Sequence, residues 1–123
     1  MRSKNKQVSS EELSTAIISG MEDKKASKIV LIDLKGVSGA VADYFVVCSG
    51  SSDTQVESIS KGVDEAVHKQ TGENPWHVEG RTNREWILLD YGNVVAHIFK
   101  QDKRDFFALE DLWGDAKIIE ITN

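Results

Sequence analysis

The stretch that decides the fold runs from Trp86 to Trp113 and reads WILLDYGNVVAHIFKQDKRDFFALEDLW. Its first apolar run, residues 86–89, stops at Asp90. Residues 91–93, Tyr-Gly-Asn, can turn the chain because Gly and Asn tolerate positive φ angles. A second apolar run, residues 94–99, is rich in residues that favour strands. The pattern predicts an antiparallel hairpin.

Helical spacing replaces the strand pattern further along this stretch. The apolar residues there recur three or four positions apart, at Phe106, Leu109, Leu112 and Trp113. Asp105 stands where a carboxylate can cap the first turn. We therefore expect a short helix that begins near Asp105. The mixed charges of residues 100–105 predict a solvated turn before it.

Upstream of the hairpin, the sequence predicts two helices, each with its own start signal. Ser9 and Glu12 have capping-box spacing, and the helix after them has an apolar face of Leu13, Ala16, Ile17 and Met21. Ser52 and Gln55 repeat the signal before a stripe of Val56, Ile59, Val63, Ala66 and Val67. Gly72 is expected to end this second helix, because glycine readily takes a left-handed conformation.

Four further segments have the character of strands or extended chain. Residues 29–34 and 44–48 are short, nearly continuous aliphatic runs, typical of buried strands. Residues 76–78 predict a short strand before the hairpin. The tail at 118–121 predicts either another short strand or an extended arm. Together the segments predict one α/β domain with a mixed sheet of about five strands, flanked by helices.

Composition sets limits on what such a domain can be. The chain has 123 residues, of which 40% are hydrophobic, enough for one domain with its own core. Residues 1–8 are polar and expected to be disordered, so the domain spans 9–123. No membrane span or signal peptide is visible, and the single Cys48 excludes a disulfide framework, which favours the cytoplasm. The net charge of -5 predicts no direct nucleic-acid readout and suits a basic protein partner.

Ser49-Gly50-Ser51-Ser52 is the segment most typical of phosphate binding, because it precedes a helix whose first N–H groups attract anions. The same residues also fit a plain capped helix start. Nucleotidyltransferases combine a Gly-Ser entry with clustered carboxylates that hold two Mg²⁺ ions. Within the hairpin Asp90 is the only acidic residue. We therefore expect no catalytic residue, no cofactor and no metal site.

The histidines and the cysteine also favour structural roles. His68, His77 and His97 lie far apart and lack metal-ligand spacing. His97 alternates with apolar residues along its strand, which favours a partly buried structural histidine over a catalytic one. Cys48 lies inside an apolar run and is expected to be a core residue rather than a nucleophile.

Several segments of the chain occur together, in this order and spacing, in one known family. They are Asp43-Tyr44-Phe45-Val46-Val47-Cys48-Ser49-Gly50, Ser52-Asp53, Gln55-Val56, Glu79-Gly80, Trp86-Ile87-Leu88-Leu89-Asp90-Tyr91-Gly92, Val94-Val95, His97-Ile98-Phe99, Arg104, Leu109-Glu110, Leu112-Trp113 and Asp115-Ala116. Over most of residues 12–117 the chain thus resembles the ribosomal silencing factor family, also called the Iojap family. Asn93 departs from the acidic residue usual after that glycine, and Ala96 from a larger aliphatic residue.

The resemblance implies a nucleotidyltransferase-like fold without transferase activity. It also implies binding to ribosomal protein fourteen of the large ribosomal subunit. Such binding sterically blocks joining of the small subunit and represses translation when nutrients are scarce. Homodimers are implied as well. A hypothesis of another class is a small nucleotide-binding or nucleotidyltransferase enzyme that uses the helix start at Gly50-Ser51, and a nucleotide titration with Mg²⁺ separates the two.

Trp86 is the candidate anchor for a ribosomal partner. An aromatic residue at the head of a strand is either part of the core or a binding anchor. Strand alternation places Trp86, Leu88 and Asp90 on one face and their neighbours on the other. Because only one face can be covered by the helices, we predict that Trp86 lies on the open one. The predicted partner-binding residues are Trp86, Leu88, Asp90, Tyr91 and Lys100.

Overall fold

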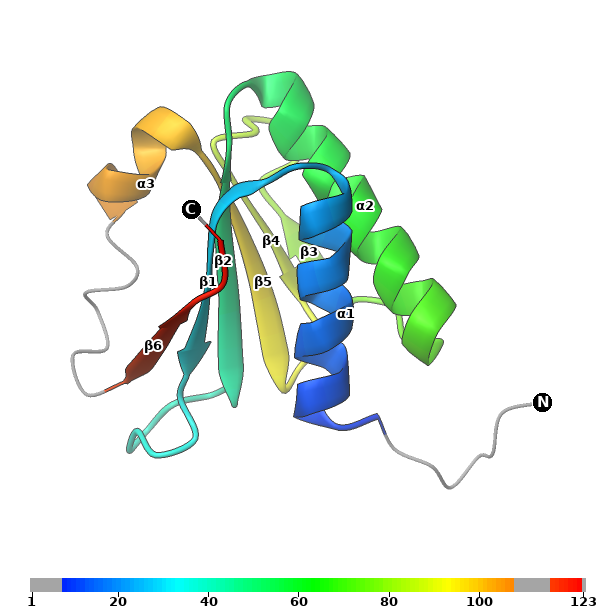
Figure 1. Ribbon diagram of the computed structural model, residues 1–123, viewed down its shortest axis with the longest axis vertical. Helices are drawn as coiled ribbons and strands as arrows, with labels where there is room; N and C mark the ends of the chain where they lie inside the picture. The colour runs from blue at the N-terminus through cyan, green and yellow to red at the C-terminus, as the bar shows by residue number, and fades with distance from the viewer. Residues whose placement is uncertain (1–7, 108–115, 123) are drawn as a thin grey trace.

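One mixed β-sheet forms the central layer of the protein, whose computed structural model describes residues 8–107 and 116–122 (Figure 1). Within these residues six strands lie in the order β3-β4-β5-β2-β1-β6. Their bounds are β1 Ser27–Asp33, β2 Tyr44–Gly50, β3 His77–Glu79, β4 Trp86–Asp90, β5 Val94–Lys100 and β6 Lys117–Glu120. The β2–β5 pair is parallel and the other pairs are antiparallel. The predicted α/β fold is confirmed, and the tail supplies the sixth strand.

The predicted hairpin is present as β4 and β5. Trp86 pairs with Phe99 and Asp90 with Val95, so the register runs through the whole of β4. Gly92 has a φ of 88°, a left-handed conformation that glycine adopts without steric cost. The Asp90 carboxylate accepts a hydrogen bond from the Gly92 N–H at 2.8 Å and so holds the turn closed.

Two helices, α1 (Ser10–Asp23) and α2 (Asp53–Thr71), lie side by side on one face of the sheet (Figure 1). The predicted capping box of α1 is complete, because Ser9 and Glu12 each accept a hydrogen bond from the other's backbone N–H. Val8 already packs against the core, one residue before the predicted start of the domain. Among the described residues, no helix is both long enough and apolar enough to span a bilayer.

At the start of α2, one of the two hydrogen bonds of the predicted capping box is present and the other is made to a different residue. Ser52 caps the helix by accepting from the Gln55 N–H at 3.1 Å. The Gln55 side chain, however, accepts from the Ser51 N–H at 2.6 Å instead of the Ser52 N–H. Its amide nitrogen also donates to the carbonyls of Lys24 and Lys25, both at 3.2 Å. Gln55 therefore ties the start of α2 to the end of α1. Gly72 ends α2 with a φ of 80°, as predicted.

The helix after β5 begins earlier than predicted. It is α3 (Gln101–Phe107), so residues 101–105 are helical and the prediction of a solvated turn there is wrong. The reason is Arg104, whose side chain is 7% exposed. Its guanidinium donates to the Lys28 carbonyl at 2.6 Å and to the Ser49 hydroxyl at 3.0 Å, which holds the segment against β1 and β2. The predicted positions Leu109, Leu112 and Trp113 lie outside the described residues.

The two faces of the hairpin have separate surroundings. Ile87, Leu89 and Tyr91 are buried against α1 and α2. Trp86 and Leu88 belong to a second apolar cluster, together with Val30, Ile32, Leu34, Ala42, Phe45, Val47, Val95 and Phe99. The prediction that Trp86 lies on the face away from the two long helices is therefore confirmed. Residues of the β1–β2 loop also pack on this second face.

Candidate functional site

Four ring-bearing side chains on the second face form what we call the aromatic cluster: Phe45, Trp86, His97 and Phe99. Trp86 stacks on Phe99, with ring centroids 5.0 Å apart and an interplanar angle of 27°. Phe45 meets the His97 ring edge-on at 4.6 Å. These rings come together because Trp86 opens β4 opposite Phe99, while His97 and Phe99 alternate along β5.

A hydrogen bond joins the two polar rings of the cluster. The Trp86 indole N–H donates to His97 Nδ1 at 3.0 Å. His97 is only 4% exposed, and its burial lowers its pKa to about 3, so the ring is neutral at physiological pH. Because Nδ1 accepts, the single ring proton lies on Nε2, which has no hydrogen-bond partner among the described residues. The predicted burial of His97 is confirmed.

Leu88 and Asp90 continue the Trp86 face along β4. Leu88 is half-buried against the second cluster. Asp90 lies at the far end of the strand, about 13 Å from Trp86 by strand rise, and its carboxylate serves the turn at Gly92. On β3 the exposed His77 and Glu79 stand opposite Asp90 and Leu88 and hydrogen-bond to each other. The Trp86 face therefore has an apolar end and a polar, partly acidic end.

Tyr91 does not share this face. Its side chain is 5% exposed and packs in the core beneath the helices. Burial, together with the nearby Asp64 carboxylate, raises the pKa of its hydroxyl. The structure thus corrects the grouping of Tyr91 with Trp86, since a residue inside the helix-covered core cannot present its ring beside one on the opposite face.

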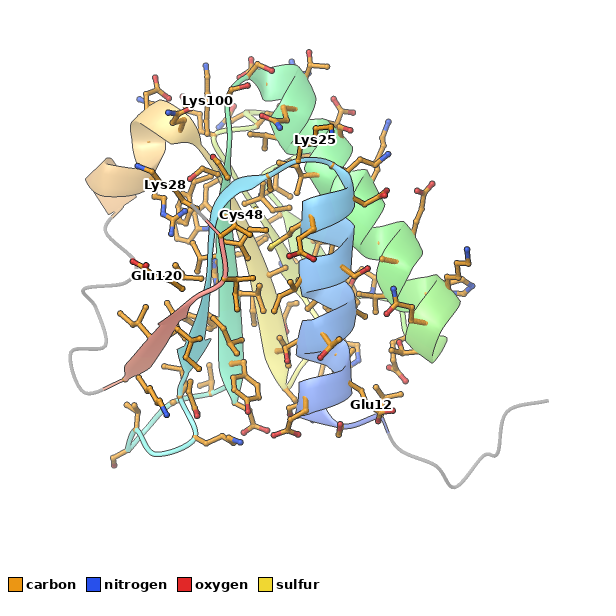
Figure 2. The ribbon with its side chains drawn as sticks, viewed as in Figure 1. Glu12, Lys25, Lys28, Cys48, Lys100 and Glu120 are labelled. Atoms are coloured by element: carbon orange, nitrogen blue, oxygen red, sulfur yellow. The ribbon has the colours of Figure 1, made fainter. Side chains whose placement is uncertain are left out.

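Lys100 lies near the Trp86 end of the hairpin but turns toward α2. Its ammonium is 3.2 Å from an Asp53 carboxylate oxygen, and that hydrogen bond raises the pKa of the lysine. Figure 2 shows Lys100 at the end of the sheet where β2 and β5 finish, the end that also carries Lys25 and Lys28. Because Lys100 follows Phe99 on β5 and pairs with Asp53 of α2, its side chain is directed to the helix-covered side and not to the Trp86 face.

Trp76 is an exposed aromatic residue whose position the sequence pattern did not reveal. It was expected inside a strand, but β3 begins one residue later, and Trp76 is 78% exposed. One edge of its indole packs over Gly92, where an added Cβ would lie 3.0 Å from the ring. The only sequence signal was its position after the polar segment 73–75, which is typical of a loop.

Side chains of the protein itself already accept hydrogen bonds from donors at the Gly-Ser helix start. The Ser52 hydroxyl accepts a hydrogen bond from the Gln55 N–H. The Gln55 side-chain oxygen accepts from both the N–H and the hydroxyl of Ser51. An anion at this point would compete with these side chains for the same donors. The local geometry therefore favours the capped helix start over a phosphate site. Cys48, just upstream, is fully buried, which raises the pKa of its thiol and fits a core residue.

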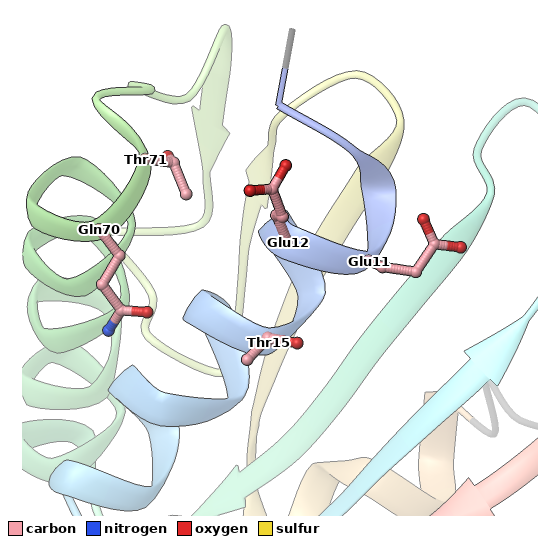
Figure 3. A pocket seen from close by; sticks show the side chains of 5 residues that line it. All are labelled: Glu11, Glu12, Thr15, Gln70 and Thr71. Atoms are coloured by element: carbon pink, nitrogen blue, oxygen red, sulfur yellow. The ribbon is translucent and has the colours of Figure 1, made fainter. Parts of the chain in front are cut away.

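A surface hollow of about 310 Å³ between α1 and α2 contains two carboxylates, but they have other roles (Figure 3). Glu12 belongs to the capping box. Glu11 binds the Lys35 ammonium and the Tyr44 hydroxyl, both at 3.0 Å, and turns away from α2 in Figure 3. Lys35 lowers the pKa of Glu11. Throughout residues 8–107 and 116–122, no three His, Cys, Asp or Glu side chains are grouped so that they could hold a metal ion.

Fold and site together define a single-domain α/β protein whose distinctive surface is an aromatic sheet face. The chain belongs to the family described as "Ribosomal silencing factor during starvation", whose model matches residues 7–123. It is 37% identical over 114 residues to the ribosomal silencing factor RsfS of Halalkalibacterium halodurans, covering 93% of this chain and 96% of that one. It is 39% identical over 100 residues to the protein of the same name from Bacillus subtilis, covering 81% and 83%.

Solved structures agree with this assignment. An X-ray structure of a Chromobacterium violaceum protein superposes with a TM-score of 0.80 at 29% identity, covering 91% of this chain and 90% of that one. A crystal structure of a Bacillus halodurans protein gives a TM-score of 0.77 at 33% identity, covering 90% and 99%. Membership of the family makes this a protein of ribosome silencing and translation regulation.

Proposed function

We propose that this protein binds the large ribosomal subunit through ribosomal protein fourteen and sterically blocks joining of the small subunit. Translation would then be silenced when nutrients are limiting, in the cytoplasm. Family membership supports the ribosomal role. The observation that carries the proposal of a contact surface is Trp86, a partly exposed indole on the sheet face that α1 and α2 leave free.

The proposed contact surface consists of Trp86, Leu88 and Asp90, and Lys100 lies outside it because its side chain turns toward α2. The apolar end of this surface, Trp86 with Leu88, has the form of an interface anchor, and its polar end lies further along β4 at Asp90. Asp90 and the nearby exposed Glu79 supply negative charge suited to a basic ribosomal protein. Tyr91 is left out of the surface because it is buried in the helix-covered core.

The decisive test of blocking is subunit joining in purified components. Large subunits are incubated with the protein, small subunits are added at a Mg²⁺ concentration that favours joining, and light scattering follows the formation of whole ribosomes. We expect the protein to slow joining in proportion to its occupancy of the large subunit. Preincubation with small subunits alone is the control and should have no effect. Unchanged joining at saturating protein would refute the proposal.

We also propose that the protein forms a homodimer. Both edge strands of the sheet lie beside exposed apolar side chains: Trp76 precedes β3, while Ile118 and Ile119 of β6 are 44% and 38% exposed. Unpaired strand edges with apolar side chains are surfaces that proteins commonly cover by association. This proposal is independent of the ribosomal contact.

A further inference from the structure

We infer that His97 is a positioning residue for the partner-binding indole: its Nδ1 fixes which edge of Trp86 faces outward. The inference rests on the proposed function, because it assigns Trp86 the role of anchor. His97 itself is too deeply buried to be a contact residue, with 4% of its surface exposed. It would act entirely through Trp86.

Two of the contacts that the indole makes restrict different motions. The stack on Phe99, with centroids 5.0 Å apart, sets the plane of the Trp86 ring. Stacking is weakly directional, so it tolerates an indole turned over within that plane. The hydrogen bond to His97 at 3.0 Å requires the N–H edge to point inward to β5. The benzene edge of the indole is thereby directed away from His97.

His97 is in turn held by its own surroundings. Phe45 meets its ring edge-on at 4.6 Å, with an angle of 68° between the rings. Its backbone lies in the middle of β5, paired to Leu88 on one side and to Val47 on the other. An acceptor fixed in this way presents its lone pair at one point only. Trp86, on the neighbouring strand, meets that point with its N–H edge turned toward β5.

A fixed indole favours binding because less side-chain freedom is lost on association. Ordering one rotamer-rich side chain at an interface reduces affinity by about threefold to tenfold. A Trp86 that is already oriented avoids that loss. Removing the acceptor should therefore weaken partner binding by about fivefold, even though His97 touches no partner.

The test uses two variants of the full chain, His97→Phe and His97→Asn. Phenylalanine keeps a ring in the cluster but has no acceptor. The asparagine side chain can place its amide oxygen near the position of Nδ1 and serves as the conservative rescue. The first readout is the Trp86 indole N–H resonance of the isolated protein, assigned by its loss in Trp86→Phe. We expect its solvent exchange to accelerate in His97→Phe and to remain slow in His97→Asn.

The second readout is affinity for large subunits, measured as a double-mutant cycle with Trp86→Phe, which lacks the indole N–H. We expect His97→Phe to weaken binding about fivefold in the native background and to have no further effect in the Trp86→Phe background. Equal weakening in both backgrounds would show a general structural role and overturn the inference. An indole N–H unchanged by His97→Phe would overturn it as well.

Failure of the proposed function gives a different result. If Trp86→Ala leaves large-subunit binding unchanged, the Trp86 surface is not the anchor, and the positioning role falls with it. The indole N–H measurement on the isolated protein still reports whether His97 holds Trp86 in place. Should His97→Phe fail to fold, His97→Leu, which also lacks an acceptor, takes its place: loss of both indole N–H protection and binding supports the inference, and retention of binding without protection contradicts it.

Discussion

At the scale of single residues, close approach between the helices depends on glycine. Gly20 of α1 faces Gly62 of α2, and a Cβ added at Gly20 would lie 2.7 Å from the Gly62 carbonyl oxygen and from Val63 Cα. Both obstacles are backbone atoms, which cannot move without separating the helices. A glycine inside a helix normally reduces stability relative to alanine. Here the packing of α1 on α2 reverses that preference.

We predict that Gly20→Ala destabilises the protein by about 1–3 kcal/mol, despite the better helix propensity of alanine. Urea unfolding followed by far-UV circular dichroism measures the change. The matched control is Gly36→Ala, because no atom lies within 4 Å of an added Cβ at Gly36. The control should leave stability unchanged within about 0.5 kcal/mol. A Gly20→Ala variant as stable as the native protein would contradict the described helix packing.

A second prediction at this scale concerns the pH dependence of stability that His97 causes. Its pKa is about 3 in the folded protein and near 6.5 when unfolded, so the unfolded state binds more protons between these values. The contribution of neutral His97 to the free energy of unfolding is therefore fully present above pH 6.5 and is lost as the pH falls toward 3. Between pH 7 and 5 the native protein should lose about 2 kcal/mol more than His97→Asn, which cannot titrate. Denaturant unfolding at both pH values measures the difference, and equal losses would refute the assignment.

Several residues show how far sequence could go. The strand alternation of residues 86–91 predicted both faces of β4, because a buried face requires the period of two. The same alternation placed Tyr91 on the face opposite Trp86, but Tyr91 was grouped with Trp86 as a polar neighbour on the hairpin. Arg104 was misread because its partners, Lys28 and Ser49, are distant in sequence. No local pattern reveals such a contact.

At the scale of elements, the start of α2 is capped by side chains of the protein itself. Ser52 and Gln55 accept from two of the backbone N–H groups near this helix start, and the Gln55 amide also donates to the carbonyls of Lys24 and Lys25 at the end of α1. The capping signal at this helix start was readable from spacing. The sequence did not show that the Gln55 side chain accepts from the Ser51 N–H rather than the Ser52 N–H, because that choice depends on where α1 ends in space. Helix α3 was misplaced for a similar reason.

We predict no nucleotidyl-transfer activity from this site. The Gly50-Ser51 segment stands at an occupied helix start, and Asp90 serves the Gly92 turn. Incubation with Mg²⁺ and labelled nucleotides, followed by chromatography of the products, should show none. A metal-dependent turnover that disappears in Asp90→Asn would overturn the proposal of a non-catalytic protein. A titration with Mg²⁺ and nucleotide, followed by tryptophan fluorescence, is the companion test for binding without turnover.

At the scale of the whole molecule, the sheet ends in two edges with exposed apolar side chains nearby. We predict a homodimer, with a mass twice the 13.7 kDa of the chain. Light scattering coupled to size-exclusion chromatography at tens of micromolar measures it. Trp76→Glu and Ile119→Glu, placed beside opposite edges, distinguish which edge is used, because a charge there should shift the mass to that of a monomer. A monomer mass for the unmodified protein at these concentrations would contradict the dimer.

The central claim is that the Trp86 face meets the large ribosomal subunit, and co-sedimentation with isolated large subunits tests it most directly. We predict that Trp86→Ala weakens binding about thirtyfold, equivalent to about 2 kcal/mol, while the protein stays folded at the temperature of the assay. The matched control Trp76→Ala removes an exposed indole elsewhere and should bind as the native protein does. A melting curve on each variant verifies folding. A folded Trp86→Ala protein that sediments with large subunits at native affinity would contradict the claim.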